Sequence, residues 1–219
     1  MLFQCLRKCG IVLLTVSLFF FIYRCLNIRL KPVTVKADGN CLFNSVSLAV
    51  YATETYSMEL RVRCCVHMFD NPRLIEKDNV ELALNRKLSD ADYNMMIQSS
   101  VDSCIVNSDV NIMAKAHARK MMFVGKYASI LEVICLADCL NISIDLIYPS
   151  EHNLFTKKEL FSGRISPTTD STLKSITLSW TSTSDTNVQS GRWMPNHFVP
   201  CGQLKVSEVI LKQEGYLDF

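Results

Sequence analysis

The sequence predicts an α+β fold in which helices pack on a small, mostly antiparallel sheet. Helical periodicity dominates residues 41–140, whereas the runs typical of strands, apart from a short one at 33–35, come after it. The composition is that of a globular protein, with 49% hydrophobic and 20% charged residues and few glycines or prolines. A chain of 219 residues is long enough for one domain with a sizeable core and short extensions.

Charge and cysteine usage argue against several functional classes. The formal net charge is +2, from 23 basic and 21 acidic residues, which gives no broad basic surface, and we expect no nucleic-acid partner. The ten cysteines include no C-x-x-C pair, a spacing that disfavours a zinc site, and we expect neither a metal nor a cofactor. Free thiols in a reducing compartment explain the cysteines most simply.

Residues 1–31 are interpreted as a separate hydrophobic segment and linker. Cys9–Tyr23 carries no charge, and as a helix it would span about 22 Å, less than the roughly 30 Å hydrocarbon core of a bilayer. A signal peptide fits the basic start but lacks a small-residue cleavage site, and a core helix would need a polar face. We favour a short membrane anchor over residues 9–26. The basic residues that follow place the rest of the chain in the cytosol, with a cytoplasmic or a secreted protein as alternatives.

The first predicted elements of the domain frame Cys41. Residues 33–35, Val-Thr-Val, predict a short strand, and residues 37–40, Ala-Asp-Gly-Asn, predict a turn. From Cys41 to Val50 the apolar side chains recur at helical spacing. The pattern therefore predicts a helix that begins at Cys41.

More helices are predicted in the middle of the chain. Ser57 is the expected N-cap of a helix over 58–69, which ends before Asn71-Pro72. The mixed, polar segment 73–128 predicts several short helices. Ser129 opens a further helix, because the apolar residues that follow it fall on one face.

The last predicted elements are strands. Residues 142–148 alternate well enough for a strand that Pro149 ends, and residues 175–180 and 197–201 predict two more. The polar residues 181–193 lie between the last two runs. Such a composition is typical of a loop that joins the strands of a hairpin.

Cys41 is a candidate nucleophile because of its place at a predicted helix start. Unpaired backbone amides and the positive end of the helix dipole favour a thiolate there. Gly39 lets the chain turn sharply, so that amides can point at one place and stabilise an oxyanion when the thiolate attacks a carbonyl. A cysteine at a helix start is more often a small buried hydrophobe, so the assignment also needs a base.

Four histidines are candidates for that base. His67 lies in an amphipathic helix and is expected to pack or to face solvent, His117 falls among basic residues on a solvated face, and His152 lies in a loop. His197 begins an apolar stretch after a polar loop, at a strand edge where its side chain can face a cleft. An early cysteine, a helical middle and a late histidine on a strand is the general layout of cysteine hydrolases.

Three stretches resemble the ovarian-tumour (OTU) family of cysteine proteases. DGNCLFNSVS at 38–47 resembles the nucleophile motif, in which Asp-Gly-x-Cys leads a helix. Residues 125–148 are similar to the family's central helix–strand unit, and NHFVP at 196–200 resembles its late histidine followed by an aromatic residue. The matches cover most of 33–202. The combination also resembles divergent vertnin-like relatives, which are often associated with mobile elements and some of which have lost the cysteine.

The resemblance implies a papain-like OTU fold over 32–205, followed by a tail at 206–219. It also implies a deubiquitinase, whose partner is ubiquitin or a ubiquitin-conjugated protein. Cys41 would attack the isopeptide carbonyl at the ubiquitin C-terminus. His197 would deprotonate the thiol and then protonate the leaving lysine amine.

The resemblance also assigns the loop before the cysteine and exposes one departure. Asp38, with Gly39 and Asn40, would shape the oxyanion hole. The family usually has Asn or Asp two residues after the histidine to orient its ring, and here that position is Val199. Asn196 or Asp38 could orient the ring instead. The alternative function is therefore a weak or inactive OTU-like domain that binds ubiquitin or another protein; an unrelated hydrolase is a third possibility.

Overall fold

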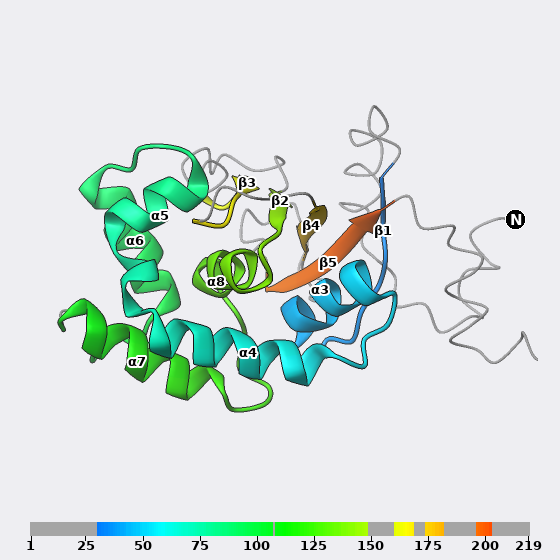
Figure 1. Ribbon diagram of the computed structural model, residues 1–219, viewed down its shortest axis with the longest axis horizontal. Coiled ribbons are helices and arrows are strands. Elements are labelled where there is room, and N and C mark those ends of the chain that lie inside the picture. The colour runs from blue at the N-terminus through cyan, green and yellow to red at the C-terminus, as the bar shows by residue number, and fades with distance from the viewer. Residues whose placement is uncertain (1–29, 107, 149–159, 169–173, 182–195, 203–219) are drawn as a thin grey trace, which may run out of the picture.

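The computed structural model describes residues 30–106, 108–148, 160–168, 174–181 and 196–202 (Figure 1). The elements follow in chain order: β1 (Lys31–Pro32), α3 (Cys41–Tyr51), α4 (Ser57–Asp70), the 3₁₀ helix η3 (Pro72–Ile75), α5 (Lys77–Leu84), α6 (Asp90–Ser100), α7 (Val110–Met121), α8 (Ile130–Leu140), β2 (Ser143–Ile147), β3 (Gly163–Ile165), β4 (Ser175–Thr181) and β5 (His197–Gly202). The predicted anchor, His152 and almost all of the predicted 181–193 loop lie outside the described residues. Among the described helices, none has the length and apolar character needed to cross a bilayer.

The five strands form one mixed sheet in the order β1-β5-β4-β2-β3. β4 and β5 pair antiparallel, with Thr181 opposite His197, as the hairpin prediction requires. The pairs β1–β5 and β2–β3 are also antiparallel, whereas β2 and β4 are parallel. The predicted α+β fold with a mostly antiparallel sheet is therefore confirmed.

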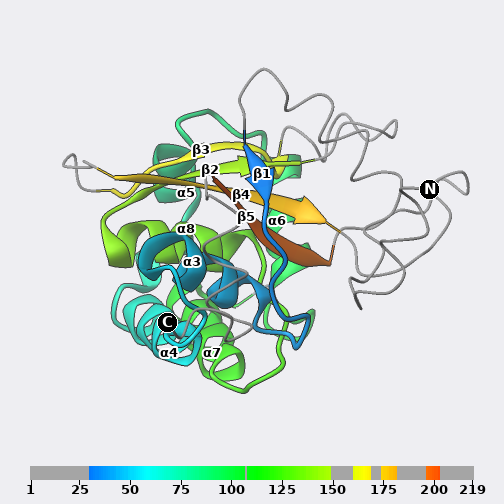
Figure 2. The same cartoon turned by 90° about the vertical axis from the view of Figure 1, so that its right-hand side faces the viewer.

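Four helices, α3, α8, α4 and α7, form two layers beneath the sheet. α3 packs on β5 and β4, and α8 packs on β2 and β3. α4 lies below both of these helices and beside α7, so that α3 separates α4 from β5 (Figure 2). One hydrophobic core runs through these layers, and it includes Leu42 and Phe43 of α3, Val133 of α8 and Leu178 of β4.

The two helices under the sheet begin and end where local sequence dictates. At the start of α8 the Ser129 hydroxyl accepts a backbone hydrogen bond, and Glu132 bonds back to the Ser129 amide (2.6 Å), which completes a capping box. Asn141 ends α8 in the left-handed conformation. α3 begins at Cys41 as predicted, and its first eight residues are all buried. This burial fixes α3 firmly against β5.

Three predicted details are wrong. The edge strand is Lys31–Pro32 rather than 33–35, because the ladder ends where the Val33 amide donates to Pro200 (2.9 Å), which has no N–H to return the bond. Ser57 is the first residue of α4 and not its cap, since its own amide already bonds to Glu54. β3 is missing from the prediction because three residues are too few to show an alternating pattern.

Candidate active site

Cys41 lies where the first turn of α3 meets the start of β5. One helical turn further on, the Ser45 hydroxyl donates a hydrogen bond to the carbonyl of Phe198 (3.0 Å). Because residues i and i+4 share a helix face, Cys41 is directed at the same part of β5. His197, the first residue of β5, directly precedes Phe198. The fold thus brings the candidate nucleophile and the candidate base to one joint between helix and strand.

Burial keeps both side chains neutral in this state. Cys41 is 1% exposed and His197 is 5% exposed. Burial raises the pKa of the Cys41 thiol, and hydrogen bonding from the main chain of Phe198 and Leu42 offsets only part of this effect. Burial likewise lowers the pKa of His197, with partial offsets from the charge of Asp38 and from a hydrogen bond to the Val35 main chain. The expected resting thiolate is therefore wrong, because desolvation outweighs the helix terminus.

Asp38 organises the loop before Cys41. Its Oδ1 accepts hydrogen bonds from the Asn40 amide (2.8 Å) and from Nδ2 of Asn44 (3.3 Å). Burial acts to raise the pKa of Asp38, but these hydrogen bonds outweigh it and the pKa falls below its usual value. Asp38 already engages the Asn40 amide, and the main-chain groups that hydrogen-bond to the sulfur are those of Phe198, Leu42 and Cys41 itself. The loop residues directly precede α3, and the amides of the first turn of α3 are candidate oxyanion donors.

Gly39 is required by a close approach of two backbone segments. Its φ is +81°, in the region that favours glycine. A Cβ at this position would lie 2.4 Å from the main-chain oxygen of Gly125. Any other residue would therefore separate the loop before Cys41 from the turn that follows α7.

The structure contains no conventional orienter for His197 within the described residues. Nδ1 of His197 is buried without a hydrogen-bond partner there. Val199, at the position of the family's Asn or Asp, is 2% exposed. The backbone amide of Asn196 donates to the carbonyl of Thr181 (3.1 Å), which fixes the chain just before His197. The negative charge of Asp38 acts on the imidazole and raises its pKa.

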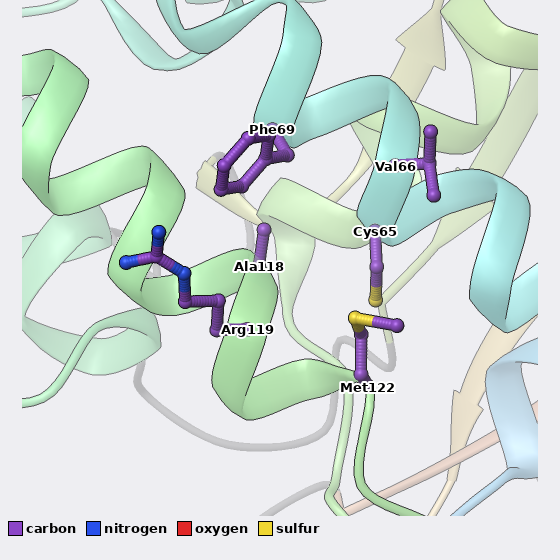
Figure 3. A pocket seen from close by; sticks show the side chains of 6 residues that line it. All are labelled: Cys65, Val66, Phe69, Ala118, Arg119 and Met122. Atoms are coloured by element: carbon purple, nitrogen blue, oxygen red, sulfur yellow. The ribbon is translucent and has the colours of Figure 1, made fainter.

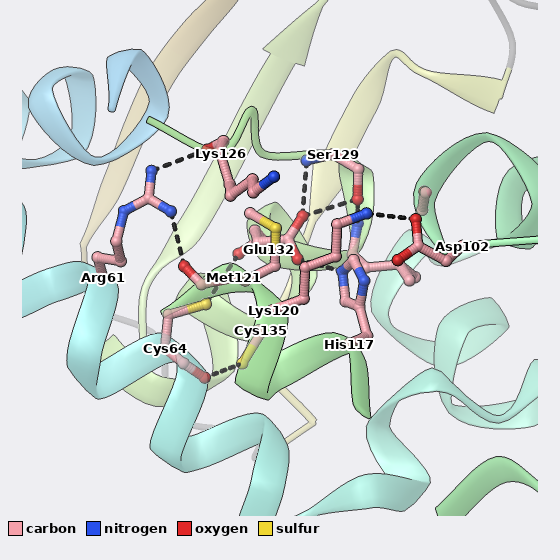
Figure 4. Close-up of polar contacts among 12 residues, drawn as sticks. Arg61, Cys64, Asp102, His117, Lys120, Met121, Lys126, Ser129, Glu132 and Cys135 are labelled. Carbon is pink, nitrogen blue, oxygen red and sulfur yellow. Dashed lines mark hydrogen bonds and ion pairs between the residues drawn. The ribbon is translucent and has the colours of Figure 1, made fainter. Parts of the chain in front are cut away.

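The other described histidines are structural. Nε2 of His67 bonds to Asp138 (2.7 Å) at a partly exposed position. His117 is not on a solvated face as expected, because α7 turns it inward, where its Nε2 lies 2.6 Å from Oε1 of Glu132 (Figure 4). This pair is almost completely buried and lies in the α7–α8 interface. No hydrogen bond joins the Cys41 thiol to any of the three described histidines, His197 included.

A groove between α4 and α7 is separate from this site. It has a volume of about 310 Å³ and is lined by Cys65, Val66, Phe69, Ala118, Arg119 and Met122 (Figure 3). Burial raises the pKa of the Cys65 thiol to about 12, which makes it a poor nucleophile. Among the described residues, no cluster of His, Cys, Asp and Glu has a metal-binding arrangement.

Arg61, a fully buried arginine on α4, was not predicted as a site residue from the sequence. Its guanidinium bonds to the carbonyl of Gly39 (2.8 Å), two residues before Cys41. The signal was present in the sequence, because Arg61 shares the helix face of Cys64, Cys65 and Met68, which are all buried. A cation inside an apolar stripe usually has a dedicated partner.

Comparisons with known proteins agree with this architecture. The profile of the family described as Vertnin, OTU domain, matches residues 32–181. Vertnin of Danio rerio is 26% identical over 123 residues, which are 55% of this chain and 18% of that protein; the chain therefore matches less than a fifth of its relative's length.

Solved OTU domains show low sequence identity. The OTU domain of OTUD1 is 20% identical, with a TM-score of 0.47 over 89% of this chain and 99% of that one. The viral OTU domain protease from Farallon virus is 16% identical, with a TM-score of 0.43 over 79% of this chain and 83% of that one. An OTU domain in complex with ubiquitin is 13% identical, with a TM-score of 0.44 over 85% and 89%. Because the family profile spans well over half of its residues, the chain belongs to the OTU-domain family, in its vertnin branch.

Proposed function

We propose that residues 32–205 form a thiol-dependent deubiquitinase, which hydrolyses isopeptide bonds at the ubiquitin C-terminus. The observation that carries the proposal is the joint between α3 and β5, where the Ser45–Phe198 hydrogen bond sets Cys41 against the strand that begins with His197. Membership of the OTU family supports ubiquitin as the proposed partner. No step of the proposed reaction requires a cofactor.

The proposed reaction begins from a neutral thiol and a neutral imidazole. His197 takes the proton of Cys41 as the sulfur attacks the isopeptide carbonyl carbon, and the carbonyl oxygen becomes an oxyanion near the amides of Cys41 and Leu42. His197 then gives its proton to the leaving lysine amine as the C–N bond breaks. Water hydrolyses the resulting thioester, which releases the ubiquitin carboxylate and restores the thiol.

A second function, binding without turnover, is favoured by one specific set of observations. Nδ1 of His197 lacks a partner among the described residues, and Val199 replaces the usual orienting side chain. An imidazole held only by packing and by a hydrogen bond to the Val35 main chain spends part of its time in the wrong tautomer or direction. A domain of this kind would bind ubiquitin or another protein through the same face and turn over slowly or not at all.

A ubiquitin carrying a C-terminal electrophile separates the two functions. A deubiquitinase forms a covalent adduct that is lost in Cys41→Ala and kept in Cys104→Ala, the matched control at an exposed free cysteine. Capture of ubiquitin without an adduct supports the binding module. An adduct that persists in Cys41→Ala rejects Cys41 as the nucleophile.

A further inference from the structure

Arg61 connects the loop before Cys41 to the turn after α7. Its Nη2 donates to the carbonyls of Gly39 (2.8 Å) and Lys126 (2.9 Å). Its Nη1 donates to the carbonyls of Met121 (2.7 Å) and Phe123 (3.3 Å). The contacts with Met121 and Lys126 can be followed in Figure 4. One buried guanidinium therefore holds two backbone segments together through four carbonyl groups.

Arg61 is unusual because its partners are neutral. Within the described residues, no carboxylate forms an ion pair with it, and its guanidinium lies over the ring of Phe43, 4.4 Å from the centroid. Its Nε is buried without a hydrogen-bond partner there. A fully buried cation is costly for a fold, and an apolar side chain of similar size often serves stability equally well. Stability alone is therefore a weak explanation for an arginine here.

The Gly39–Asn40 peptide is held at both ends. Arg61 bonds its carbonyl oxygen, and Asp38 accepts its N–H (2.8 Å). Gly39 has a φ of +81°, and glycine readily allows such a peptide to rotate. Because α4 lies on the side of α3 that faces away from β5, the bond to Arg61 directs this carbonyl away from the joint where Cys41 meets β5.

We propose that Arg61 is a positioning residue, which fixes the Gly39–Asn40 peptide so that its carbonyl does not face the oxyanion. With the peptide held, its carbonyl points away and the N–H groups of the first turn of α3 face the place where negative charge develops. If the peptide rotated, a carbonyl dipole would oppose them, and the transition state would lose stabilisation. The catalytic consequence of this inference rests on the proposed hydrolase function, whereas the fixed peptide does not.

Hydrogen exchange of the full chain tests the fixed peptide without any assay of activity. In Arg61→Lys, a single ammonium cannot reach the four carbonyls, so amide exchange over residues 38–42 should accelerate roughly tenfold to a hundredfold, as expected for the loss of a hydrogen bond to a charged group. Exchange within α8 should stay unchanged. The matched control is Arg63→Lys on the same helix, an exposed residue paired with Glu59, which should alter neither region.

Two kinetic measurements then test the catalytic consequence. In Arg61→Lys, kcat for a ubiquitin conjugate should fall about tenfold to a hundredfold with KM nearly unchanged, a loss somewhat smaller than that from deleting an oxyanion donor outright. Alkylation of Cys41 by iodoacetamide should keep its wild-type rate, because this reaction forms no oxyanion. A merely structural role would instead lower both rates in proportion to the folded fraction.

The two hypotheses fail in different ways. Unchanged exchange over residues 38–42 in Arg61→Lys, or equal acceleration in α8, overturns the positioning role. If Arg61→Lys does not fold, rapid exchange of the Asn40 amide in the wild-type chain overturns it as well. A wild-type chain that neither reacts with the ubiquitin electrophile nor cleaves conjugates rejects the hydrolase function, while faster exchange confined to 38–42 would still establish the fixed peptide.

Discussion

At the scale of single residues, burial decides the chemistry of Cys41 and His197. Sequence identifies both side chains through the motif around the cysteine and the place of the late histidine. It could not give their protonation, because a helix terminus is visible in sequence whereas the desolvation that outweighs it arises from packing by α3 and β5. The burial of His117 was also invisible in sequence. Its basic neighbours predicted an exposed position, whereas its partner Glu132 lies on another helix and is brought to it by the fold.

The pH dependence of hydrolysis follows from these shifts. Burial lowers the pKa of His197, so the neutral base persists to lower pH than for an ordinary histidine. We expect the acid limb of kcat/KM to have its midpoint below about 6.5, the usual pKa of histidine. Because burial raises the pKa of Cys41, its alkylation should still accelerate above the usual cysteine pKa. An acid limb centred above the usual histidine value would contradict this assignment.

Val199→Asn should raise kcat. Residues i and i+2 share a face of a strand, so an amide at 199 can reach the imidazole of His197, whose Nδ1 has no partner among the described residues. The unfolding free energy should fall by about 1 kcal/mol, because a buried amide is only partly satisfied there. Steady-state kinetics and urea denaturation measure the two effects. A slower variant would show that another residue already orients the ring, and Asn196→Ala would then be compared.

At the scale of elements, the joint between α3 and β5 depends on Ser45. Ser45→Ala removes the hydrogen bond to Phe198, which should cost about 1 kcal/mol of stability and also lower kcat, because Cys41 loses its fixed distance from β5. The matched control is Ser47→Ala on the same helix. Its buried hydroxyl bonds to Thr53, away from the site, so the variant should lose similar stability and keep its kcat. Equal kcat in both variants would show that the Ser45 hydrogen bond does not position Cys41 for catalysis.

The α7–α8 contact should give a pH-dependent stability. Burial acts to lower the pKa of His117, but Glu132 outweighs it and the pKa rises; burial acts to raise the pKa of Glu132, but His117 outweighs it and the pKa falls. The raised pKa of His117 stabilises the folded state at pH values below the unfolded pKa, and this stabilisation is lost as pH rises through the folded pKa. The lowered pKa of Glu132 stabilises the folded state at pH values above the unfolded pKa, and this stabilisation is lost as pH falls through the folded pKa. The charge of Lys120 acts to lower the pKa of His117, and the charge of Asp102 acts to raise it.

Urea denaturation of the wild type and of His117→Gln at several pH values measures the contribution of the His117–Glu132 pair to stability. The difference in unfolding free energy should be largest near about pH 5.5, between the two unfolded pKa values, and should shrink towards about pH 9. A difference that grows with pH would reverse the sign and show that His117 is neutral when folded.

Elements with a strong local signal were predictable and those without it were not. The helix from Cys41 and the helix after Ser129 carry apolar periodicity, and the second also has a capping box. The strands β2, β4 and β5 are each five residues or longer, which is long enough for an alternating or apolar pattern to show in the sequence. The two-residue edge strand β1 depends on its register with β5 and on Pro200, which are tertiary facts.

At the scale of the whole molecule, the layers form the site. The sheet supplies His197 and α3 supplies Cys41. α4, on the far side of α3, supplies Arg61, which holds the loop before Cys41. The family profile ends at residue 181, before His197, so the proposed role of this histidine rests on its place at the start of β5 and on the motif at 196–200. The account therefore depends on Cys41 and His197 acting together.

Hydrolysis of an isopeptide-linked ubiquitin dimer by the full chain tests that joint action most directly. Wild type and Cys104→Ala should release free ubiquitin at equal rates. Cys41→Ala and His197→Ala should each be slower by at least about a thousandfold, because removing either member of such a pair removes most of its catalysis. Cleavage by Cys41→Ala at the wild-type rate, or no cleavage by a folded wild-type chain that still binds ubiquitin, would contradict the account.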